Sequence, residues 1–231
     1  MKIRHENGIN TLTISSRRNN AIDDNFLNEF DRLIQTTNTS FPLVIEGDGG
    51  YFCPGIDLIY TLDMNREEMM EYIIRFDRML LSVLSYPSTT YAYINGHAIA
   101  GGFALALASD YRIAHGGNYL VGYNRDRIGI DLPPVARFLY DRYISRKKEI
   151  SGLHKIEDFL ESDIIDHKIS INMLPVDKIK SESKRFKDLF SKASDILTRE
   201  RQEFVDSWYR DDVASYRKGV VSKMSESELD N

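Results

Sequence analysis

Two glycine-containing loops carry the residues of this sequence that are best suited to chemistry. Gly55-Ile56 follows the segment VIEGDGGYFCP, and Ala100-Gly101-Gly102 follows YAYINGHAI and opens a helix of small residues. Backbone N–H groups at a helix start lack partners and carry a partial positive charge, so they favour an anion or a developing oxyanion. Two converging N–H groups would form an oxyanion hole. The same pattern also fits turn glycines beside a tightly packed helix, and the residues alone leave both interpretations open.

Alternating strands and helices must position these loops. Asn7-Gly8 between two alternating segments predicts a hairpin, and apolar runs before each loop predict buried strands. The predicted strands cover residues 2–5, 9–14, 41–48 and 89–96. Apolar residues at helical spacing predict one helix capped by Asp23 or Asp24 and another over about 66–85. Short connections between these elements predict an α/β fold with helical crossovers.

The rest of the chain has a different pattern. From about residue 134 to Met224 the apolar spacing is mostly helical, and the last residues, SESELDN, predict a frayed tail. No repeat, low-complexity segment or clear linker divides the chain. We therefore expect one α/β core that is followed by a helical region.

The composition narrows the class of protein. A chain of 231 residues with 42% hydrophobic residues suits a globular protein with a sizeable core. The net charge of −5 argues against nucleic acid as a partner, since phosphate binding needs clustered Lys and Arg. The single cysteine excludes an internal disulfide and a multi-cysteine metal site, and the histidines lack metal-ligand spacing, so no metal is expected. Without an apolar signal region or a membrane-length run, we expect no membrane partner and a cytoplasmic location.

Five segments together resemble the enoyl-CoA hydratase/isomerase, or crotonase, superfamily. They are YFCPGIDL (51–58), YAYINGHAIAGGFALALASDYRIA (91–114), GINTLTISSRRNNAIDDNFLNEF (8–30), ISGLHKIEDFLESDIIDHKI (150–169) and DVASYRKGVVSKM (212–224). The resemblance implies a crotonase-like spiral of ββα units over residues 1–168 and a helical, oligomer-forming region over 169–231. It also implies a homotrimer or hexamer that binds an acyl-CoA, or an acyl-carrier thioester, and stabilises an enolate. The only cofactor implied is the coenzyme A of the substrate itself.

The resemblance assigns roles to residues near both loops. Ile56 and Gly101 occupy the positions of the two oxyanion-hole N–H donors. Arg17, Arg18 and Ala21 fall where the family's early loop approaches coenzyme A, so a cation there would meet the nucleotide phosphates. A plain surface role for the two arginines is the alternative.

The sequence departs from the family where its hydratases place two glutamates around a water molecule. Ala104 stands at the first of these positions, beside Gly102, which the resemblance assigns to close packing against the ligand site. Arg125, four residues before Gly129, stands at the second. Methyl and guanidinium groups accept no proton at neutral pH, so hydration by two glutamates is not expected.

Other side chains of the following loop could replace the missing acids. Asp126 would reach the site if the alignment moved by one residue, and Asp131 could be aimed inward by the same loop. A carboxylate in an apolar pocket has a raised pKa and suits proton transfer, whereas Asp126 between Arg125 and Arg127 also fits a solvated ion cluster. Tyr123 could donate a hydrogen bond to the substrate, and Arg125 could hold a negatively charged acyl group.

These residues support two kinds of function. As an enzyme, the protein would stabilise a thioester enolate and act as an isomerase or a decarboxylase. Decarboxylation fits the missing glutamates because departing CO₂ leaves the enolate without any base, whereas isomerisation needs an unrecognised carboxylate. The alternative is a non-catalytic thioester-binding or assembly subunit with a degenerate site, because the glycines also serve folding.

Overall fold

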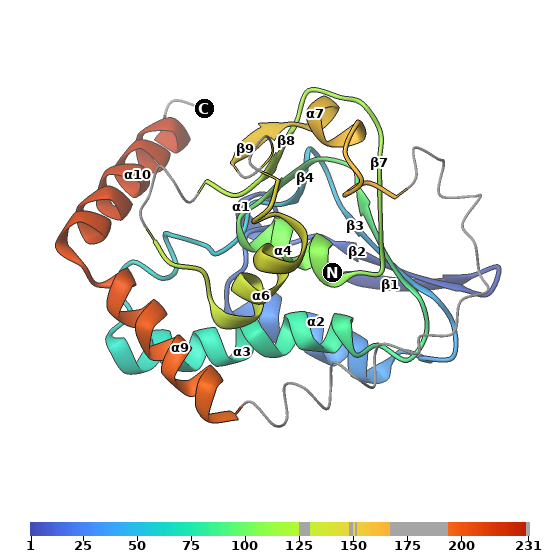
Figure 1. Ribbon diagram of the computed structural model, residues 1–231, viewed down its shortest axis with the longest axis horizontal. Coiled ribbons are helices and arrows are strands. Elements are labelled where there is room, and N and C mark those ends of the chain that lie inside the picture. The colour runs from blue at the N-terminus through green and yellow to red at the C-terminus, as the bar shows by residue number, and fades with distance from the viewer. Residues whose placement is uncertain (125–129, 148–149, 151, 167–193, 230–231) are drawn as a thin grey trace.

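Two β-sheets form the framework of the computed structural model, which describes residues 1–124, 130–147, 150, 152–166 and 194–229 (Figure 1). One sheet has the strand order β1-β2-β3-β5-β7, and the other has the order β4-β6-β8-β9. The strands are β1 (Lys2–Glu6), β2 (Ile9–Ile14), β3 (Leu43–Gly47), β4 (Tyr51–Cys53), β5 (Thr90–Ile94), β6 (His97–Ile99), β7 (Tyr111–Ala114), β8 (Leu120–Gly122) and β9 (Leu153–Lys155). β1 and β2 pair antiparallel, as do β8 and β9, and the other paired strands are parallel. The α/β prediction is confirmed.

The N-terminal hairpin follows from its turn residues. β1 pairs with β2 so that Lys2 lies opposite Thr13. Asn7 and Gly8 have φ values of +52° and +75°. A two-residue hairpin turn requires positive φ at both positions, which Asn-Gly tolerates better than other pairs. The hairpin prediction is confirmed.

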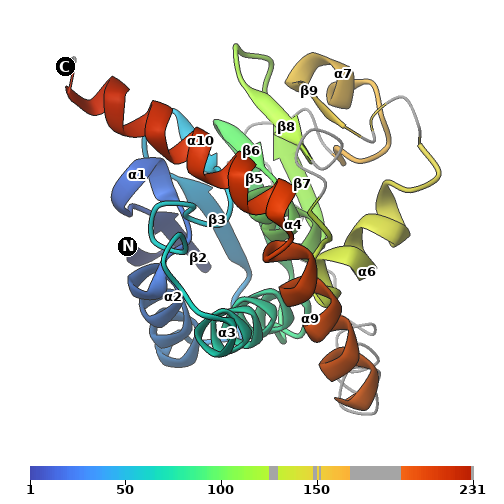
Figure 2. The ribbon, with the colours of Figure 1, turned by 90° about the vertical axis from the view of Figure 1, so that its left-hand side faces the viewer.

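The helices supply the crossovers between strands. They are α1 (Arg17–Asn20), α2 (Asp24–Thr36), α3 (Arg66–Leu84), α4 (Gly101–Ala108), α6 (Pro134–Tyr143), α7 (Ile156–Leu160), α9 (Ser194–Trp208) and α10 (Asp211–Leu229). α2 begins at the Asp23 cap, whose carboxylate accepts the Phe26 N–H at 2.7 Å. α3 begins at a capping box in which Asn65 and Glu68 each accept the other's backbone N–H. Figures 1 and 2 show α2 and α3 side by side on one face of the five-stranded sheet.

α4 lies at the centre of the molecule because its sequence, GGFALALA, is apolar on every side. All of its residues except Gly101 are buried. It contacts α3 and α6 as well as β4, β5 and β6. A helix that is hydrophobic all round belongs inside the protein, so the start of α4 is fixed rigidly between the two sheets.

The C-terminal part is mostly helical, with two differences from the sequence prediction. β9 adds a short strand that pairs antiparallel with β8. α10 continues through Leu229, so residues 225–229, for which the sequence predicts a frayed tail, have a helical backbone. The predicted boundary between 168 and 169 lies outside the described residues. Figure 2 shows α9 crossing α3 and α10 continuing away from it.

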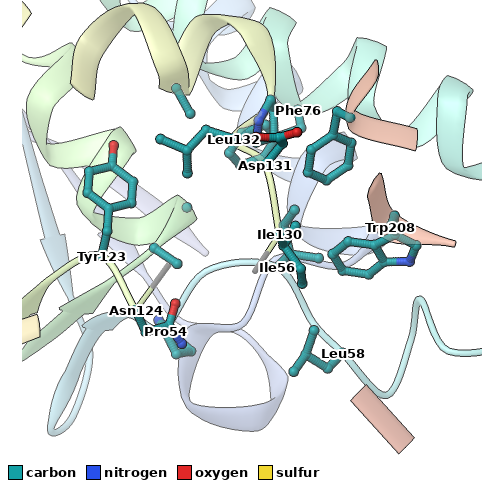
Figure 3. Close-up of a pocket in the computed structure, with 15 residues that line it drawn as sticks. Pro54, Ile56, Leu58, Phe76, Tyr123, Asn124, Ile130, Asp131, Leu132 and Trp208 are labelled. Atoms are coloured by element: carbon teal, nitrogen blue, oxygen red, sulfur yellow. The ribbon is translucent and has the colours of Figure 1, made fainter. Parts of the chain in front are cut away.

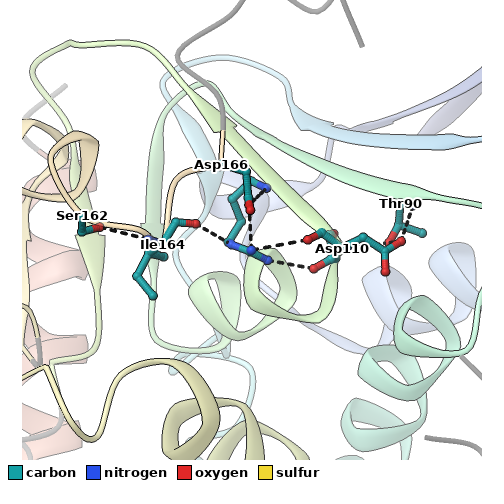
Figure 4. A network of polar contacts seen from close by, with 7 residues as sticks. Thr90, Asp110, Ser162, Ile164 and Asp166 are labelled. Carbon is teal, nitrogen blue, oxygen red and sulfur yellow. Dashed lines mark hydrogen bonds and ion pairs between the residues drawn. The ribbon is translucent and has the colours of Figure 1, made fainter. Parts of the chain in front are cut away.

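A buried arginine joins β7 to the segment that follows α7 (Figure 4). Arg112 Nε donates to the Ile164 carbonyl at 2.7 Å, and its Nη2 pairs with Asp166 at 2.7 Å. Next to it, Asp110 accepts the Thr90 N–H at 2.7 Å and the Thr90 hydroxyl at 3.0 Å. These contacts hold the segment after α7 against β7 and the start of β7 against β5.

Candidate functional site

A cavity of about 120 Å³ lies where the two glycine loops meet α3, α6 and α9 (Figure 3). Most of its wall is apolar. The lining residues are Pro54, Ile56, Leu58, Phe76, Ala100, Gly101, Tyr123, Asn124, Ile130, Asp131, Leu132, Pro133, Ala136, Phe204 and Trp208. An apolar cavity with a few polar groups is typical of a site for a small molecule.

The two glycine loops touch each other at the edge of this cavity. Gly55 has a φ of +98°, and a Cβ atom there would lie 2.9 Å from the Gly101 nitrogen. A side chain at position 55 would therefore separate the loops. A parallel bridge fixes the first loop, because the Ile22 N–H donates to the Gly55 carbonyl at 2.8 Å and the Asp57 N–H donates to the Ile22 carbonyl at 3.0 Å.

The N–H groups of Ile56 and Gly101 are the polar atoms of this backbone wall. Neither one donates to an acceptor among the described residues, although both residues line the cavity. Gly101 is the first residue of α4, where the helix dipole adds a partial positive charge. This arrangement can hold an oxygen atom that carries negative charge.

The start of α4 has a strained backbone. Ala100 has a φ of +49° and a ψ of −112°, which is unusual for a residue with a side chain. Two hydrogen bonds hold it there: its N–H donates to the Gly122 carbonyl, and its own carbonyl accepts the Ala104 N–H, both at 2.9 Å. The strain occurs at the peptide that leads into Gly101.

Two of the predicted site residues lie behind the wall and do not line the cavity. A Cβ atom on Gly102 would lie 1.9 Å from the Cys53 carbonyl oxygen, so α4 packs directly on β4 there. Ala104 is fully buried in the hydrophobic core. Cys53 is also fully buried, and burial raises the pKa of its thiol to about 12, which makes it a poor nucleophile.

The early loop is a left-handed turn. Arg18, Asn19 and Asn20 all have positive φ. The buried Asn20 amide donates to the Asp48 carbonyl, just before β4, and to the Tyr51 carbonyl in β4. Arg18 Nη1 lies 2.5 Å from the buried carboxylate of Asp57, so this arginine ties the turn to the first glycine loop. Arg17 is exposed on the surface, and Ala21 is 7% exposed beneath it.

The opposite wall consists of side chains. Asp131 lines the cavity beside Leu132 and Phe76 in Figure 3. Its carboxylate lies 3.4 Å from Arg137 Nη2, and its N–H donates to the Ser207 hydroxyl at 3.3 Å. Asp131 therefore lines the cavity and also has charged and polar neighbours. Arg125 and Asp126 lie outside the described residues.

Tyr123 is the buried polar side chain of this wall. It is 2% exposed, and its ring meets Phe103 and Tyr140 edge-on at centroid distances of 5.4 and 5.3 Å. Its hydroxyl has no hydrogen-bond partner among the described residues. Burial raises the pKa of this hydroxyl well above its ordinary value, so the group is a donor and not a base.

Part of this side-chain wall comes from α9, which the sequence prediction did not include in the site. Phe204 and Trp208, one helical turn apart, line the cavity. α9 is held by Asp77 of α3, which lies 2.7 Å from Arg201 Nε and accepts the Val135 N–H at 3.3 Å. The sequence does show two aromatic residues at i, i+4 spacing, which predicts that they share one face of a helix. It does not show which surface of the protein that face covers.

Among the residues that the structure describes, no group of three or more His, Cys, Asp or Glu side chains could hold a metal ion. None of the helices described is long and apolar enough to cross a membrane.

Comparison with known proteins identifies the family of this chain. A family model described as enoyl-CoA hydratase/isomerase matches residues 4–218. The sequence is 36% identical over 88 residues to enoyl-CoA isomerase/hydratase fer4 of Mycosarcoma maydis, which covers 38% of this chain and 32% of that protein. It is 25% identical over 192 residues to the mitochondrial enoyl-CoA delta isomerase 1 of Rattus norvegicus, which covers 78% of this chain and 64% of that protein. The chain thus spans less than two thirds of either relative.

Solved structures share the fold at lower identity. The human mitochondrial delta3-delta2-enoyl-CoA isomerase aligns with a TM-score of 0.80 at 18% identity, over 98% of this chain and 99% of that chain. The enoyl-CoA hydratase from Bacillus halodurans aligns with a TM-score of 0.77 at 20% identity, over 94% and 98%. The fold expected from the sequence, a crotonase-like spiral, is confirmed.

Proposed function

The chain belongs to the enoyl-CoA hydratase/isomerase family, and from this premise we propose that it binds an acyl-CoA, or a related acyl thioester, in the cavity beside the glycine loops. The observation that carries this proposal is the pair of N–H groups, on Ile56 and Gly101, that have no acceptor among the described residues and belong to residues that line the cavity. They would hold the thioester carbonyl oxygen and stabilise the enolate that forms from it. The apolar wall would accept the acyl chain, and the exposed Arg17 would meet the phosphates of coenzyme A.

Two reactions of such an enolate need different side chains. In decarboxylation of a malonyl-type thioester, the electrons of the breaking C–C bond pass into the enolate, CO₂ leaves, and a proton from solvent completes the product. In isomerisation of a 3-enoyl thioester, a base removes a proton from C2 and returns it at C4. Asp131 is the carboxylate that lines the cavity within the described part of the chain, and it is paired with Arg137. We propose Asp131 as the base of an isomerase; a decarboxylase would need none.

Water addition is the least supported reaction. Ala104, at the first glutamate position of the family's hydratases, is buried in the core and has no group that accepts a proton. A single carboxylate would then have to do the work that two glutamates share in the family's hydratases. The proposal is therefore an isomerase- or decarboxylase-type activity, with a non-catalytic thioester-binding subunit as the alternative.

Turnover of three thioesters separates these cases. Purified protein is incubated with a 3-enoyl-CoA, a 2-enoyl-CoA and malonyl-CoA, and product formation is compared with binding measured by calorimetry. If Asp131 is the base, Asp131→Asn lowers 3-enoyl turnover by about a hundredfold or more, whereas Asn at the exposed Asp141 changes nothing. Malonyl turnover that survives Asp131→Asn identifies the decarboxylase. Binding without turnover supports the non-catalytic subunit, and no binding of any thioester contradicts the proposal.

We further propose that the protein forms a homotrimer or hexamer through its C-terminal helices. Ile196 on α9 and Tyr216 and Met224 on α10 are large apolar side chains that are 57%, 37% and 42% exposed in the single chain. Burying them between copies would remove apolar surface from water. Light scattering that gives the mass of one chain at micromolar concentration would contradict this proposal.

A further inference from the structure

Tyr123 has a feature that the proposed reaction does not use. Its hydroxyl is buried and has no hydrogen-bond partner among the described residues, while the ring is fixed by Phe103 and Tyr140. A buried hydroxyl without a partner is destabilising and rare in native proteins, so its presence calls for an explanation. The same residue lines the cavity.

The surroundings of Tyr123 restrict what could satisfy this hydroxyl. The rings of Phe103 and Tyr140 offer no strong acceptor, and a trapped water molecule needs two to four polar partners to be stable. Figure 3 shows Tyr123 and Trp208 on opposite sides of the cavity with Ile56 and Ile130 between them, so a ligand that pairs with Tyr123 would also lie against these apolar side chains. Burial raises the pKa of the phenol and keeps it protonated, so its O–H needs an acceptor atom on the ligand.

This inference rests on the proposed function: we propose that Tyr123 selects acyl groups that carry a neutral oxygen, a hydroxyl or a keto group, beyond the thioester carbonyl. Such an oxygen completes the missing hydrogen bond when the side chains of the wall adjust to the ligand. A plain hydrocarbon chain leaves the hydroxyl unpaired and binds more weakly. A carboxylate is not selected here, since a single O–H group does not compensate the removal of a charge from water.

Two kinds of measurement test the inference on the full chain. Binding of butyryl-CoA and of each enantiomer of 3-hydroxybutyryl-CoA is measured by calorimetry for wild type, Tyr123→Phe and Tyr140→Phe, and the thermal midpoints are measured without ligand. We expect wild type to bind one hydroxyacyl thioester about tenfold more tightly than butyryl-CoA, and Tyr123→Phe to lose that preference. Tyr123→Phe should also raise the thermal midpoint by about 2–4 °C, because it removes an unpaired buried hydroxyl.

Tyr140→Phe is the matched control, since Tyr140 packs against Tyr123 but is only partly buried. It should keep the preference of wild type for the hydroxyacyl thioester. A preference that persists in Tyr123→Phe, or wild type binding all three thioesters equally, overturns the inference and leaves the proposed function standing. A lower midpoint of Tyr123→Phe together with weaker binding of every thioester assigns Tyr123 a structural role instead. If wild type binds none of the thioesters, the proposed function fails and this inference fails with it.

Discussion

The cavity has two walls of opposite construction, one made of backbone and one made of side chains. The backbone wall presents the N–H groups of Ile56 and Gly101, which close packing and a short helix hold in place. The side-chain wall presents Tyr123, Asp131 and Trp208, which come from segments far apart in the sequence. Ala104, which the resemblance places at a glutamate position, lies in the core and belongs to neither wall of the cavity. The comparison shows that the backbone wall leaves little room for a change in side-chain size, whereas the side-chain wall determines which polar side chains face the cavity.

The largest effect on stability is expected at Gly102, where an added side chain would meet the closest backbone contact. Gly102→Ala should lower the free energy of unfolding by more than about 3 kcal/mol, because its Cβ would lie 1.9 Å from the Cys53 carbonyl oxygen. Gly219→Ala in α10 is the control, since a Cβ atom there meets nothing within 4 Å. It should stabilise the protein by up to about 1 kcal/mol, as alanine favours a helix more than glycine does. Urea denaturation measures the free energy of unfolding of both variants. A Gly102→Ala variant as stable as wild type would show that α4 and β4 can move apart to make room for the added methyl group.

The backbone wall was the part of the site that could be predicted from the sequence. Gly55 and Gly102 stand out because backbone contacts there leave no room for a side chain, and a Cβ atom on Gly101 would lie 3.1 Å from the Phe76 ring. The strands β1, β2, β3 and β5 and the helices α2 and α3 follow their apolar spacing and capping residues because these signals are local, whereas the short strands β4, β6 and β7 were not predicted. Asn7-Gly8 and Asp23 are examples of a turn and a cap that act within a few residues.

The side-chain wall was harder to predict because its contacts are not local. Asp131 belongs to a loop whose direction depends on Ser207 of α9, 76 residues later. Arg18 was expected to face phosphates, and the structure pairs it with Asp57, 39 residues away. Asp77 lies on the apolar face of α3, and no spacing rule indicates that its partner is Arg201. Such partners are defined by how the helices pack, and a single sequence does not show that.

Asp77, which pairs with Arg201 and so holds α9 at the side-chain wall, should make the free energy of unfolding depend on pH. Burial raises the pKa of Asp77 from 3.8 to about 6, Glu200 acts in the same direction, and Arg201 and the Val135 N–H oppose the change. The folded protein therefore holds this proton more tightly than the unfolded chain does. The free energy of unfolding should fall as the pH rises from about 4 to about 6, by up to about 3 kcal/mol from this group, and show no further change from it above that range.

Urea denaturation at pH 4, 5, 6 and 7 measures this slope. Asp77→Asn removes the titrating group and should flatten the curve between pH 4 and 6. Asp141→Asn, at an exposed position, should leave the dependence of the free energy of unfolding on pH as it is in wild type. An unchanged slope in Asp77→Asn would mean that other groups produce the pH dependence and that the Asp77–Arg201 pair is already ionised throughout this range.

The smallest expected effect tests whether the strain in the backbone wall serves ligand binding. Glycine adopts the φ of +49° at position 100 without a steric penalty, so Ala100→Gly should stabilise the protein by about 1 kcal/mol, less the entropy that glycine loses on folding. Ala98→Gly is the control: Ala98 is buried two residues earlier in β6 with no positive φ, and its replacement should destabilise. If the strain keeps the Gly101 N–H in place, Ala100→Gly should also weaken thioester binding severalfold, because a flexible residue would then precede the donor. Unchanged binding with increased stability would show that the packing of Gly101 on Phe76 and Gly55 is sufficient to hold the donor, and that the strain at Ala100 contributes nothing to the site.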